Sequence, residues 1–86
     1  MKTVSEIAEI QDGKVLFSAS WCGPCSALIK YIESKGIEGI EIFKVDNDVQ
    51  AVKTLWNVKT VPTLIVLDKG AEVGRFVGEL EIKPQL

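Results

Sequence analysis

The sequence predicts an α/β fold, with a central four-stranded mixed sheet flanked by helices, in a single domain over residues 1–86. Apolar residues recur with the period of a helix in some segments and fill short runs typical of buried strands in others. Because helices separate the first three strands, we expect these strands to pair in parallel through right-handed crossovers. Only a short turn separates the last two strands, so they should form an antiparallel hairpin at the edge of the sheet.

The first half of the chain predicts a helix, a strand and a second helix, in that order. Residues 2–11 have the apolar spacing of an amphipathic helix, which ends near Gly13. Residues 15–19 form a nearly continuous apolar run, which favours a buried strand covered on both faces. The second helix begins around Pro24, because proline suits the first helical turn, and Gly36 serves as its C-cap.

The second half of the chain predicts one more helix and three strands. Turn residues or a glycine bound the strands, and an aspartate precedes the helix as its N-cap. These elements are a strand over residues 40–45, a helix from Asp48 through Trp56, a strand over residues 63–67 and an edge strand over residues 72–77. Residues 79–86 can form only a short helical segment, because Pro84 interrupts it.

Composition and charge argue against several classes of partner. The chain has a net charge of −2 and no basic run, so neither nucleic acid nor an anionic membrane is an expected partner. Its apolar runs are far shorter than the roughly 20 residues that a membrane-spanning helix needs. The N-terminal residues lack the apolar segment of a secretory signal, so we expect a cytoplasmic protein. No pattern predicts self-association, and a monomer is the expected state.

The two cysteines, Cys22 and Cys25, enclose Gly23 and Pro24 and follow Trp21. They lie between a predicted strand and a predicted helix, whose N-terminus favours the thiolate form of a cysteine. With two cysteines and no histidine, the chain lacks the ligands of a tetrahedral zinc site and the partners of a Cys–His nucleophile. A disulfide between such close cysteines constrains the chain little. The motif therefore favours thiol–disulfide exchange over an inert disulfide or half of a metal site.

These residues resemble the active site of the thioredoxin family, and three further motifs follow in the order typical of that family. The resemblance covers roughly residues 14–80 and rests on Trp21-Cys22-Gly23-Pro24-Cys25, the cis-proline loop Val61-Pro62-Thr63, the hairpin turn Asp68-Lys69-Gly70 and the groove glycine in Val77-Gly78. It implies a thioredoxin-like fold and a protein-disulfide reductase that takes part in electron transport and cell redox homeostasis.

The resemblance also assigns a role to each site residue. Cys22 is the nucleophile that forms a mixed disulfide with a client protein, and Cys25 resolves that disulfide. The other residues belong to the active-site loop (Trp21, Gly23 and Pro24) or to client binding (Val61, Pro62, Thr63 and Gly78). A cis peptide bond is expected before Pro62. The implied partners are disulfide-containing client proteins and a thioredoxin reductase or another dithiol donor, and no cofactor is expected beyond the cysteine pair.

The chain departs from the larger thioredoxins in length and at one buried position. It has no room for their additional first strand and long last helix, and its core is closer in size to glutaredoxin. Six residues before the first cysteine, where the family typically has a buried aspartate that transfers protons to and from the second cysteine, this chain has Leu16. Ile42 takes the position of the lysine associated with that aspartate. We therefore expect slow resolution by Cys25, with Ser18, Ser20 or a water molecule relaying the proton.

Three alternatives to a thioredoxin-type reductase remain open from the sequence. The first is a glutaredoxin-like protein that glutathione or another small thiol reduces. The second is a binding subunit of a larger assembly, in which the cysteines are secondary. The third is transient handling of a soft metal ion by the dithiol.

Overall fold

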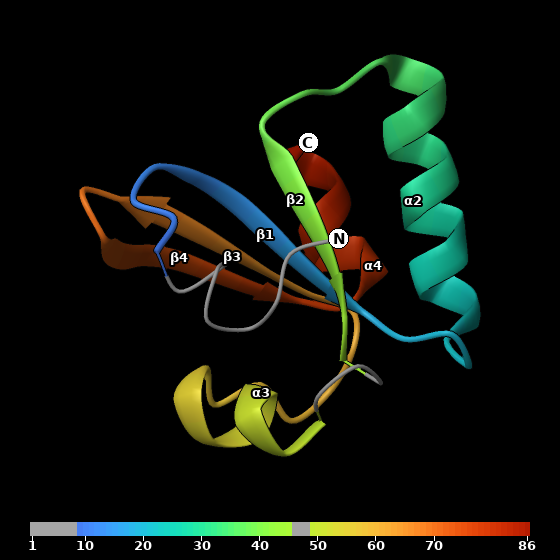
Figure 1. Ribbon diagram of the computed structural model, residues 1–86. Helices are drawn as coiled ribbons and strands as arrows, with labels where there is room; N and C mark the ends of the chain where they lie inside the picture. Colours follow the sequence, from blue (N-terminus) through green and yellow to red (C-terminus); the bar gives the residue numbers. More distant parts are fainter. Residues whose placement is uncertain (1–8, 46–48) are drawn as a thin grey trace.

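The computed structural model describes residues 9–45 and 49–86, which form a four-stranded mixed sheet in the order β2-β1-β3-β4 with helices on both faces (Figure 1). This confirms the predicted fold class. The elements are β1 (Gly13–Ser18), α2 (Gly23–Lys35), β2 (Ile40–Lys44), α3 (Val49–Leu55), β3 (Thr63–Asp68), β4 (Ala71–Val77), α4 (Glu79–Ile82) and the 3₁₀ helix η2 (Lys83–Gln85). The helix predicted over residues 2–11 falls mostly outside the described residues. Asp48, the predicted N-cap of the helix that corresponds to α3, also lies outside them.

The direction of β3 differs from the expectation that all helix-separated strands run in parallel. β1 and β2 are parallel, but β3 is antiparallel to β1, with Thr63 opposite Phe17. For β3 to be parallel, the connection after β2 would have to carry the chain back to the end of the sheet where β2 began. At seven residues, α3 is only about 10 Å long, so the chain enters β3 at the end of the sheet where β2 finished.

Both faces of β1 are buried, as its continuous apolar run predicted. Val15 and Phe17 belong to a core cluster that includes Val52 of α3. Leu16 points to the opposite face and belongs to a second cluster with residues of α2 and α4, among them Leu28. Figure 1 shows the same arrangement, with α2 and α4 on one side of the sheet and α3 on the other. Alternation along one strand thus supplies both halves of the core.

The boundaries of α2 follow from its end residues. Pro24 lies in the first turn, where its missing N–H leaves no hydrogen bond unmade. At the other end Gly36 adopts φ 64°, and its N–H donates to the carbonyls of Ile32 and Glu33. A residue with a Cβ is strained in this left-handed conformation, so the glycine stops the helix at Lys35. Both predicted helix ends are confirmed.

Arg75 of β4 links the sheet to the C-terminal end of α3. Its guanidinium donates to the carbonyl oxygens of Trp56 (2.8 Å) and Asn57 (3.1 Å). It also forms a two-pronged ion pair with Glu72, at 2.8 and 3.0 Å. These bonds hold the segment that leads from α3 toward Pro62.

The Glu72–Arg75 pair predicts an acid-dependent loss of stability. Hydrogen bonding to Arg75, with its positive charge in support, lowers the pKa of Glu72 from its usual 4.5, against a smaller opposing effect of burial. The ionised form of Glu72 is therefore favoured in the folded state over the unfolded state. Its contribution to the unfolding free energy is present above pH 4.5 and disappears as the pH falls through the lowered pKa.

Between pH 7 and pH 3, we expect the unfolding free energy to fall less in Glu72→Gln than in the wild type. The difference between the two proteins should be less than about 1 kcal/mol, because the pair is partly exposed. Urea unfolding at the two pH values measures the difference. Glu38→Gln, at an exposed glutamate, is the matched control and should behave as the wild type does. Equal acid sensitivity of wild type and Glu72→Gln would contradict the prediction.

Candidate active site

Cys22 and Cys25 form a disulfide at the N-terminal end of α2, with their Cα atoms 5.2 Å apart. Cys22 is the N-cap of the helix, and its sulfur accepts a hydrogen bond from the backbone N–H of Cys25 at 3.2 Å. The N–H of Cys22 donates to the carbonyl of Ala19, which closes the turn after β1. The positive end of the helix dipole therefore points at the Cys22 sulfur and favours negative charge on it once the disulfide is reduced.

The two cysteines differ in accessibility, although both are largely buried. The exposed fraction of Cys22 is 8%, against 0% for Cys25. Cys22 is nearly buried because it is the N-cap of the helix and its sulfur accepts from the N–H of Cys25. Trp21, immediately before it, is 67% exposed and stands out from the surface. A Cβ added to Gly23 would meet no atom within 4 Å, so this side of the loop is open to a partner.

The loop before β3 lies beside the disulfide because β3 begins opposite the end of β1. The Val61–Pro62 peptide bond is cis, as predicted. The N–H of Gly78 donates to the carbonyl of Pro62 at 3.0 Å, which joins two of the predicted client-binding residues. Thr63 is buried, and its hydroxyl donates to the carbonyl of Thr60 at 2.8 Å. This places the Thr63 side chain behind the loop, where it supports the surface.

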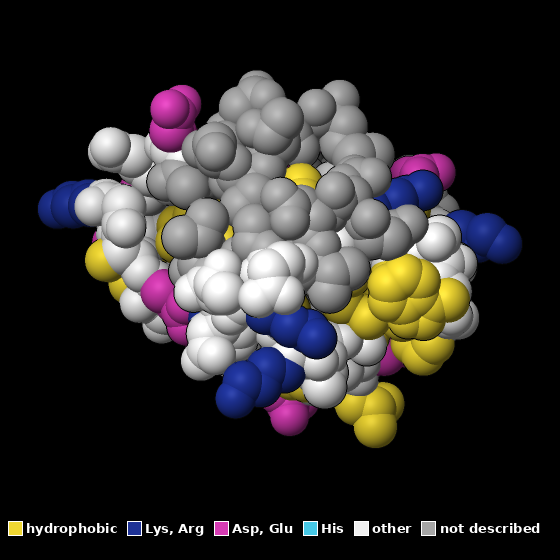
Figure 2. All heavy atoms as spheres, turned by 60° about the horizontal axis from the view of Figure 1, so that its bottom comes forward, with side chains coloured by type: hydrophobic (Ala, Val, Ile, Leu, Met, Phe, Trp, Pro, Cys, Tyr) yellow, Lys and Arg dark blue, Asp and Glu magenta, His cyan; other side chains and the backbone are white. Residues whose placement is uncertain are grey.

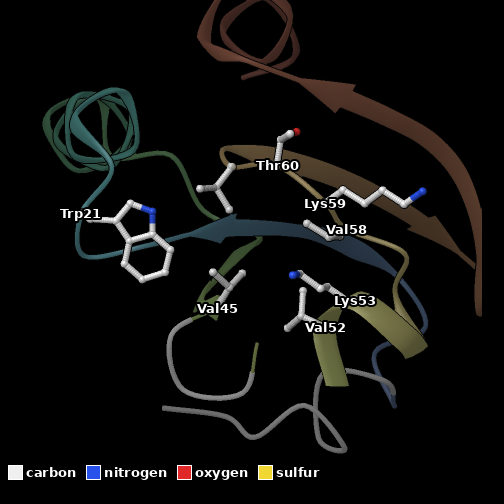
Figure 3. A pocket seen from close by; sticks show the side chains of 8 residues that line it. Trp21, Val45, Val52, Lys53, Val58, Lys59 and Thr60 are labelled. Carbon is white, nitrogen blue, oxygen red and sulfur yellow. The ribbon is translucent and has the colours of Figure 1, made fainter. Parts of the chain in front are cut away.

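Two hollows flank this loop. The first, of about 400 Å³, lies between Trp21 and α3 and has a floor of Val45, Val52 and Val58 (Figure 3). The second, of about 460 Å³, lies between the active-site loop and α4 and is lined by Pro24, Pro62, Gly78 and Leu80, among others. Val61 lines both hollows. Figure 2 shows the face that carries α3, where hydrophobic side chains gather beside lysine and arginine side chains.

Sequence reasoning missed several residues of these hollows. Leu80 is 91% exposed, and its position two residues after the predicted groove glycine was the available signal. Lys53 and Lys59 line the first hollow, but a surface lysine has no pattern that marks it for a site. Only the packing of α3 against the sheet brings them near Trp21.

The position where the family resemblance would place an acid is apolar, and it belongs to the core cluster on the α2 side of the sheet, whereas the two cysteines belong to the other cluster. Leu16 is fully buried in the cluster with Leu28, which lies one turn after Cys25 on α2, and it pairs with Ile42 across the parallel strands. Two residues along β1, Ser18 is also buried, and its hydroxyl has no hydrogen-bond partner among the described residues. Ser20, by contrast, is exposed. Ser18 is therefore the more buried of the two predicted relays.

Residues 9–45 and 49–86 contain no group of three or more cysteine, histidine or acidic side chains arranged to hold a metal ion. The two sulfurs are joined to each other in the disulfide. A disulfide at a helix N-terminus is suited to thiol–disulfide exchange.

Comparison with known proteins gives one consistent family. The family model described as Thioredoxin matches residues 3–85. A thioredoxin H-type of Fagopyrum esculentum is 38% identical over 65 residues, which cover 72% of this chain and 56% of the relative. A thioredoxin of Echinococcus granulosus is 38% identical over 80 residues, which cover 86% of this chain and 75% of the relative. The chain thus spans little more than half of the first relative and three quarters of the second.

Solved structures of thioredoxins share the fold. The crystal structure of thioredoxin from Trypanosoma brucei brucei superimposes with a TM-score of 0.72 at 25% identity and covers 99% of this chain and 85% of that one. The X-ray structure of Fasciola hepatica thioredoxin gives a TM-score of 0.69 at 32% identity, with 93% of this chain and 80% of that one covered.

Val61 lines both hollows, which predicts that its side chain contributes to the rate at which large disulfide substrates are reduced. Val61→Ala removes apolar surface from both hollows, so we expect about fivefold slower reduction of a protein disulfide. A small aromatic disulfide, which needs neither hollow, should be reduced at the wild-type rate. Steady-state assays with the two substrates measure the split.

The control is Val73→Ala, at a valine of β4 that is 62% exposed and lines neither hollow. It should leave both rates unchanged. An equal loss with both substrates in Val61→Ala would assign the effect to the thiols and contradict a docking role.

Proposed function

Because the chain belongs to the thioredoxin family, we propose that it is a thiol–disulfide oxidoreductase that reduces disulfides of client proteins. The observation that carries the proposal is the Cys22–Cys25 disulfide at the start of α2, beside the cis-proline loop. A reversible disulfide at a helix N-terminus supports redox chemistry, and the adjacent hollows offer an apolar surface to a protein substrate.

The first step is attack by Cys22 in the reduced form of the protein. Its thiolate sulfur forms a bond to one sulfur of the client disulfide, and the client's own S–S bond breaks. The other client sulfur leaves as a thiolate and takes up a proton. The N–H of Cys25 and the helix dipole stabilise the attacking thiolate. Cys25 is fully buried, so a client reaches Cys22 first.

The second step is attack by Cys25 on the sulfur of Cys22. Cys25 gives up its thiol proton, its sulfur bonds to Cys22, and the mixed disulfide breaks to release the second client thiolate, which is then protonated. The net change moves two electrons from the protein dithiol to the client, and the protein is left as the disulfide seen in the structure. With Leu16 in the interior, the Ser18 hydroxyl or a water molecule is the proposed route for the Cys25 proton.

Client binding is assigned to the surface around the loop. Trp21, Gly23 and Pro24 present the disulfide, and the exposed indole of Trp21 provides apolar contact area. Val61, Pro62 and Gly78 lie beside it, where backbone groups of an extended client segment can form sheet-like contacts. Such contacts tolerate many sequences, as a general reductase requires.

The proposal extends to partners and setting. The dithiol is regenerated by a thioredoxin reductase or another dithiol donor, and the protein thereby joins electron transport and redox homeostasis in the cytoplasm. The cysteine pair is the only redox group, and the protein acts as a monomer without nucleic acid or membrane partners. Among the described residues, no helix has both the length and the apolar character required to cross a membrane. The glutaredoxin-like alternative gains no support, because the relatives and structures named above are thioredoxins.

A trapping experiment tests the proposed function. Cys25→Ser removes the resolving thiol, so we expect the variant expressed in cells to hold client proteins on Cys22 as mixed disulfides that dithiothreitol releases. Mass spectrometry of the released proteins identifies the clients.

Cys22→Ser with Cys25 intact is the matched control and should hold few clients, because Cys25 is fully buried. Equal capture by both variants, or none by Cys25→Ser beside a working thioredoxin trap, would contradict the reductase proposal.

The apolar interior predicts that resolution is limited by proton removal from Cys25. Leu16→Asp supplies a carboxylate at the buried position, so the mixed disulfide should resolve about a hundredfold faster, in the range of general-base catalysis. Rapid-quench measurement of mixed-disulfide decay gives the rate.

Leu16→Asn is the control for the cost of a polar group in the apolar cluster, which we expect to lower the unfolding free energy by about 3 kcal/mol in both variants. Decay is compared under conditions where circular dichroism shows both variants folded. If Asp and Asn give the same decay rate, proton removal does not limit resolution.

A further inference from the structure

The described residues that line the two hollows beside the disulfide include charged side chains of opposite sign. The charged residues among the described lining of the first hollow are Lys53 and Lys59. In the second hollow, the charged residues of the described lining are Glu79 and Glu81. A partner that covers both hollows therefore contacts lysine side chains on the Trp21 side and glutamate side chains on the α4 side.

Of the two lysines that line the first hollow, Lys53 is the better placed to contact a partner. In Figure 3 its amino group points into the space among Val45, Val52 and Val58, whereas that of Lys59 points away from Trp21. The valines form an apolar floor under the ammonium group of Lys53. An acidic side chain next to an apolar one on a partner would match this combination of charge and floor.

The second hollow has the complementary arrangement. The Glu81 carboxylate accepts a hydrogen bond from the N–H of Val77 at 3.1 Å, which holds it at the end of β4. Glu79 pairs with Lys83 at 3.2 Å, so part of its charge is balanced locally. Glu81 therefore carries most of the negative character, and exposed Leu80 supplies apolar surface beside it.

Val61 connects the two hollows, because its side chain lines both. Trp21 borders the first hollow and Pro24 the second, and the two residues enclose Cys22 in the chain. An extended segment that delivers its disulfide to Cys22 thus places the residues on one side of its cysteine near Lys53 and those on the other side near Glu81.

We propose that the site selects client segments by the order of their charges. The preferred client is an extended segment with an acidic residue on one side of the attacked cysteine and a basic residue on the other, in one of the two possible chain directions. This inference rests on the proposed function, since it specifies the clients of the same site. A segment in the reversed direction places like charges together, which disfavours binding.

Three synthetic peptides test the proposal, each used as a symmetric disulfide dimer. The first has aspartate before the cysteine and lysine after it, the second has the two exchanged, and the third carries asparagine and glutamine instead. The second-order rate constant for oxidation of the reduced wild-type protein is measured at low and high salt. We expect the two charged peptides to differ by about fivefold at low salt and to converge in 0.5 M salt, because screening weakens exposed charge pairs.

Two conservative variants locate the effect. Lys53→Gln removes the positive charge, and Glu81→Gln removes the negative charge while keeping an oxygen that can accept from the N–H of Val77. Each should reduce the difference between the charged peptides, and the double variant should abolish it. Lys30→Gln, at an exposed lysine of α2 that lines neither hollow, should retain the wild-type difference.

The uncharged peptide separates this inference from the proposed function. If it is reduced but the two charged peptides react equally fast, or if the variants leave their difference intact, the charge-order proposal is overturned and the reductase remains. If the uncharged peptide is not reduced at all, the proposed function fails, and this inference fails with it.

Discussion

The antiparallel pairing of β3 with β1 is the constraint on which the site depends. Because Thr63 lies opposite Phe17, the loop that precedes β3 reaches the end of β1 where the active-site turn begins. A parallel β3 would enter the sheet at its other end and leave the cysteines without a neighbouring loop. The hydrogen bond between Gly78 and Pro62 then attaches the end of β4 to the same place. One pairing register thus assembles segments that are far apart in the chain.

Local features of the fold could be predicted from the sequence, whereas features that depend on tertiary contact could not. Pro24 and Gly36 marked the ends of α2 because each acts through its own backbone. The direction of β3 was not predictable from periodicity, which is the same for a strand read in either direction. It follows from the shortness of α3. The low exposure of Cys22 arises because its sulfur accepts a hydrogen bond from the N–H of Cys25. The lysine-lined hollow arises from the packing of α3. No local sequence pattern predicts either feature.

Two requirements oppose each other in the interior of the domain: apolar packing, which stabilises the fold, and a polar group for proton transfer. A small domain has little margin of stability, and a leucine at position 16 adds apolar burial between β1 and α2. The same choice leaves position 16, where the family resemblance would place an aspartate, without an ionisable group. Packing and proton transfer therefore compete for one position, and this chain has the residue that favours packing. On the same face of β1, the hydroxyl of Ser18 is buried and has no hydrogen-bond partner among the described residues.

The ion pair on β4 has a consequence for how molecules of this protein meet one another. β4 is at the edge of the sheet, where unpaired backbone groups can accept a strand from another chain. The charged side chains of Glu72 and Arg75 stand on this strand, and a register shift between Val66 and Leu67 bends its pairing with β3. Charge and irregular pairing are both features that discourage strand addition. The edge strand that helps to hold α3 is thereby also guarded against intermolecular sheet formation.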